Sequence, residues 1–224
     1  MIHRLRLVVW DFDGTLADTQ GDVWESLRYA ANRMGRCFPV GFEGDDEHLA
    51  LSMGQIMKAL EPAAGPEQLE SFERDVRVHY RSISTHPNTK LYPGMEALLR
   101  ELRVRGIQSR IATNKPFGAL ERLLALKGWD VLFDGWVASD MGEGGELTKE
   151  QMIRMSLLQA DADCADAVMI GDSWGDVQGA QLAGIACIGV TYGDGDTTRL
   201  LAAGPDYSVD NVTQLAGLLI GEQA

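Results

Sequence analysis

The feature that most constrains the fold is a short apolar run ending in two carboxylates, Leu7-Val8-Val9-Trp10-Asp11-Phe12-Asp13-Gly14-Thr15-Leu16. A short run of β-branched and aromatic residues predicts a strand buried on both faces, as in a parallel sheet. Ligands of open α/β sheets bind at the carboxyl ends of strands, so Asp11 and Asp13 lie where chemistry is expected. Gly14 permits the sharp turn that follows. The run predicts an α/β protein with a polar site after this strand.

Composition limits the partners that such a site can have. The 224 residues allow one or two domains, and 45% hydrophobic with 24% charged residues is ordinary for a globular protein. Lys and Arg number 20 against 33 Asp and Glu, giving a net charge of −13, which argues against a nucleic-acid partner. An anionic ligand would be repelled at long range, so a phosphorylated ligand would need local lysines and a divalent cation.

Cysteine usage and hydropathy bear on localisation. Cys37, Cys164 and Cys187 show neither pairing nor metal-ligand spacing, which predicts buried thiols in a reducing compartment. The first apolar run is too short for a signal peptide, and no stretch reaches transmembrane length. We therefore expect a cytoplasmic protein without a membrane partner, either a monomer or a homodimer.

The chain divides into two patterns. Residues 17 to about 88 read as consecutive helices with no strand between them: one capped at Asp18-Thr19 and running to about 34, one from Asp45-Asp46 to 60, and one from Pro66 to 83. From residue 93 strands and helices alternate, which predicts a parallel sheet with right-handed crossovers. The expected strands are 107–112, 135–138, 167–170, 185–190 and 207–209, and the expected helices are 95–104, 116–126, 152–158, 177–183 and 212–220.

Polar groups stand at further strand and helix ends. Thr113 ends one strand before a helix opened by Pro116, whose N-terminal amides could bind an anion. Lys149 lies at a helix N-terminus, where the helix dipole disfavours a cation, which suggests an anionic partner elsewhere. Asp172 and Asp176 follow a buried strand. For Thr113, and for Ser173 with Asp176, helix capping is the ordinary alternative.

Together these segments resemble the motifs of the haloacid dehalogenase superfamily. The pattern Asp-x-Asp-Gly-Thr-Leu is similar to its first motif, and the others match in order, at Thr113-Asn114, Lys149 and Gly-Asp172-x-x-x-Asp176. The resemblance covers nearly the whole chain and is nearest to the phosphoglycolate phosphatase and β-phosphoglucomutase branch. It implies a Rossmann-like three-layer α/β/α core, residues 1–16 and 89–224, with an inserted small α-helical cap, residues 17–88.

The resemblance also implies a reaction, the Mg²⁺-dependent hydrolysis of a small phosphorylated metabolite. Asp11 would attack phosphorus to give an aspartyl-phosphate, and Asp13 would act as general acid and base. The phosphoryl oxygens would bind Thr113, Asn114 and Lys149. The metal ligands would be Asp11, Asp13 through its carbonyl, Asp172 and Asp176.

Several alternatives remain open in the sequence. Lys149 is followed by Glu150 where many relatives have proline, so Lys115 is a second candidate for the phosphoryl lysine. Gly54, Gln55 and Lys58 of the cap, together with Lys115, are candidate substrate-facing residues, although a solvated helix face explains the three cap residues equally well. A phosphomutase would share every motif. Asp13 argues against a dehalogenase, and the chain length argues against a receiver-like phospho-acceptor.

Overall fold

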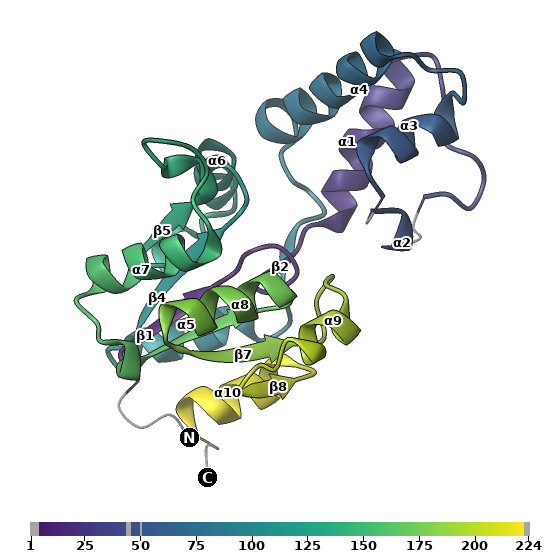
Figure 1. Cartoon of the computed structure of the whole chain (residues 1–224). Helices are drawn as coiled ribbons and strands as arrows, with labels where there is room; N and C mark the ends of the chain where they lie inside the picture. Colours follow the sequence, from purple (N-terminus) through teal and green to yellow (C-terminus); the bar gives the residue numbers. More distant parts are fainter. Residues whose placement is uncertain (1–4, 44–45, 50, 222–224) are drawn as a thin grey trace. The chain divides into compact units, whose positions relative to one another are not determined.

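The computed structural model describes residues 5–43, 46–49 and 51–221. Its chain forms two compact units (Figure 1): Met1–Asp18 with Lys90–Ala224, and Thr19–Thr89. We call these the core unit and the helical unit and describe each separately.

The core unit is built on a six-stranded parallel sheet in the order β5-β4-β1-β6-β7-β8. Its strands are β1 (Leu7–Trp10), β4 (Gln108–Thr113), β5 (Gly135–Ala138), β6 (Ala167–Gly171), β7 (Ala186–Val190) and β8 (Tyr207–Val209). The first strand pairs with both β4 and β6, with Trp10 opposite Ile111 and Ile170. All four residues of β1 are fully buried, as its apolar run predicts.

Helices cover both faces of this sheet. They are α5 (Met95–Val104), α6 (Phe117–Lys127), α7 (Lys149–Ala160), α8 (Trp174–Ala183), α9 (Thr197–Ala202) and α10 (Val212–Ile220), with short 3₁₀ turns at Asp130–Leu132, Ser139–Met141 and Cys164–Asp166. Val8 and Trp10 pack into a cluster with α5, α6 and α10, whereas Leu7 and Val9 pack with α7, α8 and Leu200. Alternate residues of one strand thus feed two apolar layers, which gives the expected three-layer α/β/α architecture.

The helical unit contains α1 (Gln20–Arg33), α2 (Asp46–Leu49), α3 (Met53–Leu60) and α4 (Pro66–Val78), which continues into a π-helical turn at His79–Ile83. Its core includes Trp24, Leu27, Ile56 and Phe72. The single helix expected over 46–60 is wrong, because Ser52 begins a new helix by a capping box with Gln55. Asp45, expected to precede it, lies outside the described residues.

Two short strands join the polypeptide where it leaves and re-enters the core unit. β2 (Ala17–Asp18) pairs antiparallel with β3 (Lys90–Leu91). The expectation of helices alone from residue 17 is therefore wrong at Ala17 and Asp18. The helix α9 was also not expected from the sequence.

The thiols differ from expectation, since Cys187 is buried but Cys37 and Cys164 are exposed. Cys37 follows α1 in a loop, and Cys164 lies in a 3₁₀ turn, so neither residue lies within the regular elements that build the cores. Among the described residues, no helix is both long and apolar enough to span a membrane.

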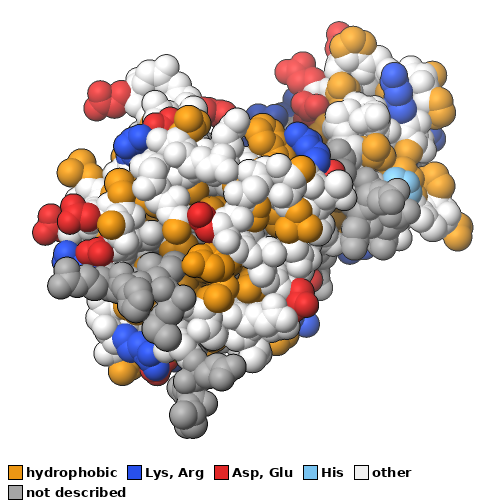
Figure 2. All heavy atoms as spheres, turned by 60° about the horizontal axis from the view of Figure 1, so that its bottom comes forward, with side chains coloured by type: hydrophobic (Ala, Val, Ile, Leu, Met, Phe, Trp, Pro, Cys, Tyr) orange, Lys and Arg blue, Asp and Glu red, His pale blue; other side chains and the backbone are white. Residues whose placement is uncertain are grey.

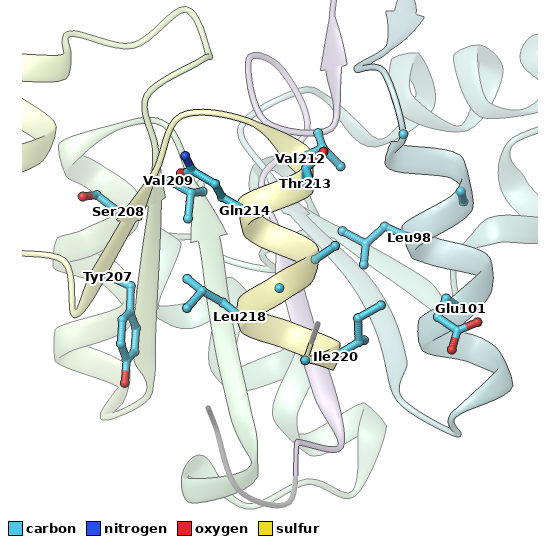
Figure 3. Close-up of a pocket in the computed structure, with 15 residues that line it drawn as sticks. Leu98, Glu101, Tyr207, Ser208, Val209, Val212, Thr213, Gln214, Leu218 and Ile220 are labelled. Carbon is cyan, nitrogen blue, oxygen red and sulfur yellow. The ribbon is translucent and has the colours of Figure 1, made fainter. Parts of the chain in front are cut away.

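A groove of the core unit, about 1070 Å³ in volume, lies between α5, β8 and α10. Figure 3 shows Leu98, Val212 and Leu218 among the side chains along it. Separately from this groove, Figure 2 shows hydrophobic side chains in the middle of the face that it draws. The groove's lining includes none of the site residues predicted from the sequence. The candidate site must be sought at the carboxyl end of the sheet.

Candidate active site

The turn after β1 is fixed by backbone hydrogen bonds and by one glycine. The amide of Asp11 donates to the Ile170 carbonyl at 2.9 Å, which extends the β1–β6 pairing by one residue. The amides of Leu16 and Ala17 both donate to the Phe12 carbonyl. Gly14 has a φ of +74°, and a Cβ there would lie 2.2 Å from Oδ2 of Asp172. The turn can approach Asp172 this closely only because residue 14 is glycine.

Lys149 links three segments at this end of the sheet. Its Nζ lies 2.8 Å from Oδ1 of Asp11 and 2.9 Å from Oδ1 of Asp176, and it donates to the Ala112 carbonyl at 2.9 Å. Burial opposes the charge on Lys149, but Asp11 and Asp176 outweigh it and raise the lysine pKa. The unfavourable place of this cation at a helix N-terminus is explained by its two carboxylate partners.

The start of α7 and its neighbour α8 hold Lys149 in place. Thr148 caps α7 through a capping box with Gln151. On α8, a Cβ at Gly179 would lie 2.7 Å from Cγ of Lys149. The absence of a side chain at Gly179 therefore leaves room for the lysine stem between the helices.

Asp172 and Asp176 follow β6 and are both buried. Oδ2 of Asp172 accepts the amides of Asp194 and Gly195 at 3.0 and 2.8 Å. Oδ2 of Asp176 accepts the hydroxyl and the amide of Ser173, the N-cap of α8. Asp176 therefore serves both purposes: Oδ2 belongs to the capping box of α8, and Oδ1 faces Lys149 in the site.

Three carboxylates converge beside one ammonium. Asp11, Asp172 and Asp176 each offer one oxygen, and these oxygens lie within 4.8 Å of one another. Burial, together with Asp176 and Asp172, raises the pKa of Asp11 to about 7 despite Lys149. Burial and Asp176 raise the pKa of Asp172 to about 6. Three carboxylates carry more negative charge than one ammonium can offset, and carboxylate oxygens are the hard ligands that Mg²⁺ prefers. The cluster therefore fits a bound Mg²⁺.

Lys115 occupies a different position from Lys149. Its Nζ lies 2.9 Å from Oδ1 of Asp13 and 5.7 Å from the centre of the Phe12 ring. Both candidate phosphoryl lysines therefore contact the first motif: Lys115 contacts Asp13, and Lys149 contacts Asp11. Because Lys149 contacts Asp11, we keep Lys149 as the predicted phosphoryl lysine.

The second motif lies at the end of β4. Oγ1 of Thr113 accepts the amide of Lys115 at 3.1 Å, and the Asn114 carbonyl accepts the Ser139 hydroxyl. The amide of Phe117, the first of α6, donates to Asp140 at 2.8 Å. This amide is therefore already bound to a carboxylate, and the expectation that the start of α6 binds an anion stays a prediction. The phosphate-binding roles of Thr113 and Asn114 remain predictions.

The predicted substrate-facing residues Gly54, Gln55 and Lys58 lie on α3 of the helical unit. Gln55 uses its side-chain oxygen in the capping box with Ser52, and Lys58 is exposed. These contacts are internal to the helical unit, and the role of the three residues stays a prediction.

Sequence reasoning missed the segment after β7. Thr15 donates to Oδ1 of Asp172 at 3.3 Å, and the amides of Asp194 and Gly195 hold the other oxygen. The available signal was the pattern Gly193-Asp-Gly195, which begins three positions after the last residue of an apolar strand. Backbone donors carry no residue-type signature, which is why only the glycines could have indicated them.

Comparison with known proteins identifies the class. The family model described as haloacid dehalogenase-like hydrolase matches residues 8–190, and the chain belongs to this family. A phosphoglycolate phosphatase of Psychrobacter arcticus is 24% identical, with 96% of each chain covered. A 5'-nucleotidase of Pseudomonas aeruginosa is 29% identical over 95% of this chain and 94% of the relative.

Solved structures agree with this class. A putative phosphatase from Clostridium difficile superposes with a TM-score of 0.85 at 25% identity, covering 97% of this chain and 99% of that one. The chain is accordingly a phosphatase of the haloacid dehalogenase-like family, similar to phosphoglycolate phosphatases.

Proposed function

We propose that this phosphatase hydrolyses a small phosphate monoester in two steps through an aspartyl-phosphate on Asp11, with Mg²⁺ as its cofactor. The contact that carries the proposal is Lys149, whose ammonium lies 2.8 Å from Asp11 and 2.9 Å from Asp176. An ammonium held beside the nucleophile can bind the oxygens of the transferring phosphoryl group and stabilise their charge.

In the first step a carboxylate oxygen of Asp11 forms a bond to phosphorus while the ester P–O bond breaks. Asp13 gives its proton to the leaving alkoxide. In the second step Asp13 takes a proton from water, which attacks phosphorus and releases inorganic phosphate and the Asp11 carboxylate. Asp13 is suited to this shuttle because its carboxylate is more than one-third exposed and is held by Lys115.

The proposed cofactor site consists of Asp11, Asp172 and Asp176, with the Asp13 carbonyl. A bound Mg²⁺ supplies positive charge that offsets the phosphoryl oxygens and the clustered carboxylates. Thr113 and Asn114 would bind the remaining phosphoryl oxygens. We further propose that the helical unit, residues 19–89, serves as the cap and selects the alcohol part of the substrate.

The substrate class follows from this site and from its relatives. Relatives named phosphoglycolate phosphatase and 5'-nucleotidase support small phosphate monoesters as the first compounds to test. The experiment is a phosphate-release assay over 2-phosphoglycolate, nucleoside monophosphates, sugar phosphates and pyrophosphate, with Mg²⁺ and with a chelator. We expect turnover that chelation abolishes and Mg²⁺ restores. Full activity after exhaustive chelation would overturn the metal-dependent mechanism.

A phosphomutase shares all these residues and is separated by one further assay. With a sugar bisphosphate as the phosphoryl donor, a mutase returns the phosphoryl group to a second sugar hydroxyl, whereas a phosphatase releases it to water. We expect inorganic phosphate and no isomerised sugar phosphate. Isomerisation faster than phosphate release would favour the mutase.

A further inference from the structure

The side chain of Asp172 is held by the segment after β7. Its Oδ2 accepts two consecutive backbone amides, Asp194 at 3.0 Å and Gly195 at 2.8 Å. Its Oδ1 accepts a longer bond from the Thr15 hydroxyl, at 3.3 Å. Two amides on one oxygen use its in-plane lone pairs. Oδ1 is therefore the oxygen of Asp172 with capacity left for a cation.

Only glycines allow the segment to lie this close. A Cβ at Gly193 would stand 2.0 Å from the Gly14 carbonyl oxygen and 2.6 Å from Cβ of Asp172. A Cβ at Gly195 would stand 2.0 Å from the Asp172 carbonyl oxygen. Both obstacles include backbone, which cannot rotate away as a flexible side chain can. Any side chain at either position must move the segment off Asp172.

The segment is anchored on both sides. The hydroxyl of Tyr192 donates to the Thr15 carbonyl at 3.1 Å, and its ring packs edge-on against Tyr92 with 4.8 Å between centroids. Burial raises the pKa of Tyr192, so its hydroxyl keeps the proton that it donates. On the other side, Asp196 caps α9 by accepting the Arg199 amide. The two amides are thus presented by a fixed backbone.

From these contacts we propose that Gly193–Gly195 is a positioning segment for Asp172: its two amides occupy Oδ2 and orient Oδ1 for the cation. The inference rests on the proposed Mg²⁺-dependent function and adds residues that the four motifs do not contain. Residues that orient a metal ligand typically change metal affinity by about 10–100-fold when they are altered. The segment should therefore control Mg²⁺ affinity separately from folding.

The test is calorimetric titration of the full-length chain with MgCl₂, with melting temperatures measured in a chelator. The variant is Gly195→Ala, and the matched control is Gly144→Ala, a loop glycine where a Cβ would meet nothing within 4 Å. We expect Gly195→Ala to raise the Mg²⁺ dissociation constant roughly 10-fold or more, while Gly144→Ala leaves it unchanged. In the chelator Gly144→Ala should melt near the wild type, whereas Gly195→Ala should melt lower, because its Cβ overlaps the Asp172 backbone.

If Gly195→Ala does not fold, Tyr192→Phe tests the same proposal. The phenylalanine lacks the hydroxyl that anchors the segment to Thr15, and it introduces no additional atom. A raised Mg²⁺ dissociation constant at an unchanged melting temperature supports the positioning segment. Wild-type Mg²⁺ affinity in folded Gly195→Ala, or in Tyr192→Phe where the former is unfolded, overturns it. If the wild type itself binds no Mg²⁺, the proposed function fails and this inference fails with it.

Discussion

At the scale of single residues, Lys149 and Lys115 each hold a different aspartate of the first motif. Replacing Lys149 by Met removes the ammonium beside Asp11 and Asp176. Loss of one preorganised charge contact of this kind costs about 2.7–4 kcal/mol in the transition state. We therefore expect kcat/KM for Lys149→Met to fall by about 10²–10³-fold in a phosphate-release assay.

Lys115→Met is the matched variant, because it removes the same functional group from Asp13 instead. We expect a smaller loss of kcat/KM than in Lys149→Met. A reversed order would make Lys115 the phosphoryl lysine and would leave Lys149 as a structural cation among buried carboxylates. Circular dichroism of both variants checks that the comparison is between folded proteins.

Variants of Asp11 and Asp13 distinguish the roles of the two residues, because they should affect formation and hydrolysis of the aspartyl-phosphate differently. Asp11→Asn removes the nucleophile, so no substrate should react, however good its leaving group. Asp13→Asn removes a proton donor and acceptor, typically worth about 10²–10⁴-fold in rate. A nitrophenyl phosphate needs little protonation of its leaving group. Asp13→Asn should therefore complete the first step and stall before hydrolysis.

The measurement is the mass of the intact protein during reaction with nitrophenyl phosphate. Asp13→Asn should gain one phosphate in a stoichiometric burst, and Asp11→Asn should gain none. Turnover by Asp13→Asn at the wild-type rate would show that Asp13 is not the base.

A site residue could be predicted from the sequence where its residue type and its position after an apolar strand together indicate a role. Asp11 and Asp172 follow apolar strands, so their meeting at one edge of a parallel sheet was predictable. The choice between Lys149 and Lys115 was not predictable, because the sequence does not show which side chain reaches which aspartate, and only the structure shows that Lys149 contacts Asp11. The amides of Asp194 and Gly195 were missed because every residue except proline carries one.

At the scale of elements, α7 and α8 pack around the stem of Lys149. A Cβ at Gly179 would lie 2.7–2.8 Å from its Cγ and Cβ. Although alanine is the better helix former, we expect Gly179→Ala to destabilise the chain by about 1–3 kcal/mol through overpacking. It should also lower kcat/KM, because Lys149 is displaced from Asp11. Urea unfolding and phosphate release measure the two effects.

Gly217→Ala on α10 is the control, since a Cβ there meets nothing within 4 Å. It should stabilise the chain by about 0.5–1 kcal/mol and leave turnover unchanged. Wild-type stability and activity in Gly179→Ala would contradict the close packing of the two helices.

Elements with strong periodicity were predictable, and short ones were not. The strand Gly135–Ala138 and the helix Met95–Val104 have the bounds that the apolar pattern predicts. The break before α3 depends on the capping box of Ser52 and Gln55. The sequence of these residues is equally compatible with a longer continuous helix, so the break was not predictable. α9 has six residues, too few to show a helical repeat of apolar residues.

At the scale of the whole molecule, the chain leaves the core unit and returns to it, so the helical unit has both ends joined to the core. Asp22 fastens those ends together within the helical unit. Its Oδ1 accepts the amide and the side chain of Asn88, and its Oδ2 accepts the amide of Thr89 at 2.7 Å and the Thr89 hydroxyl. A buried carboxylate thus satisfies four donors of the returning segment.

Asp22→Asn should destabilise the helical unit, because an amide nitrogen would face the Thr89 amide as a second donor. We expect a loss of about 2–3 kcal/mol, read as faster hydrogen exchange in peptides from 19–89 with unchanged exchange in β1, β4 and β6. Asp75→Asn, which removes only an exposed pair with Arg33, should cost about 1 kcal/mol or less. Equal exchange in both variants would contradict the role of Asp22.

The same carboxylate predicts how the stability of the helical unit depends on pH. Burial alone would raise the pKa of Asp22, but the hydrogen bonds from Thr89 and Asn88 outweigh burial and hold the pKa below its ordinary value. A lowered folded-state pKa gives stability that is fully present above the unfolded value of about 3.9 and is lost as pH falls through the folded value. His86 also faces Asp22, with Nδ1 3.9 Å from Oδ2. The difference in hydrogen exchange between wild type and Asp22→Asn, corrected for the intrinsic rate at each pH, should be full near neutrality and shrink toward about pH 3. A difference that stays constant over this range would show that the ionised carboxylate does not stabilise the helical unit.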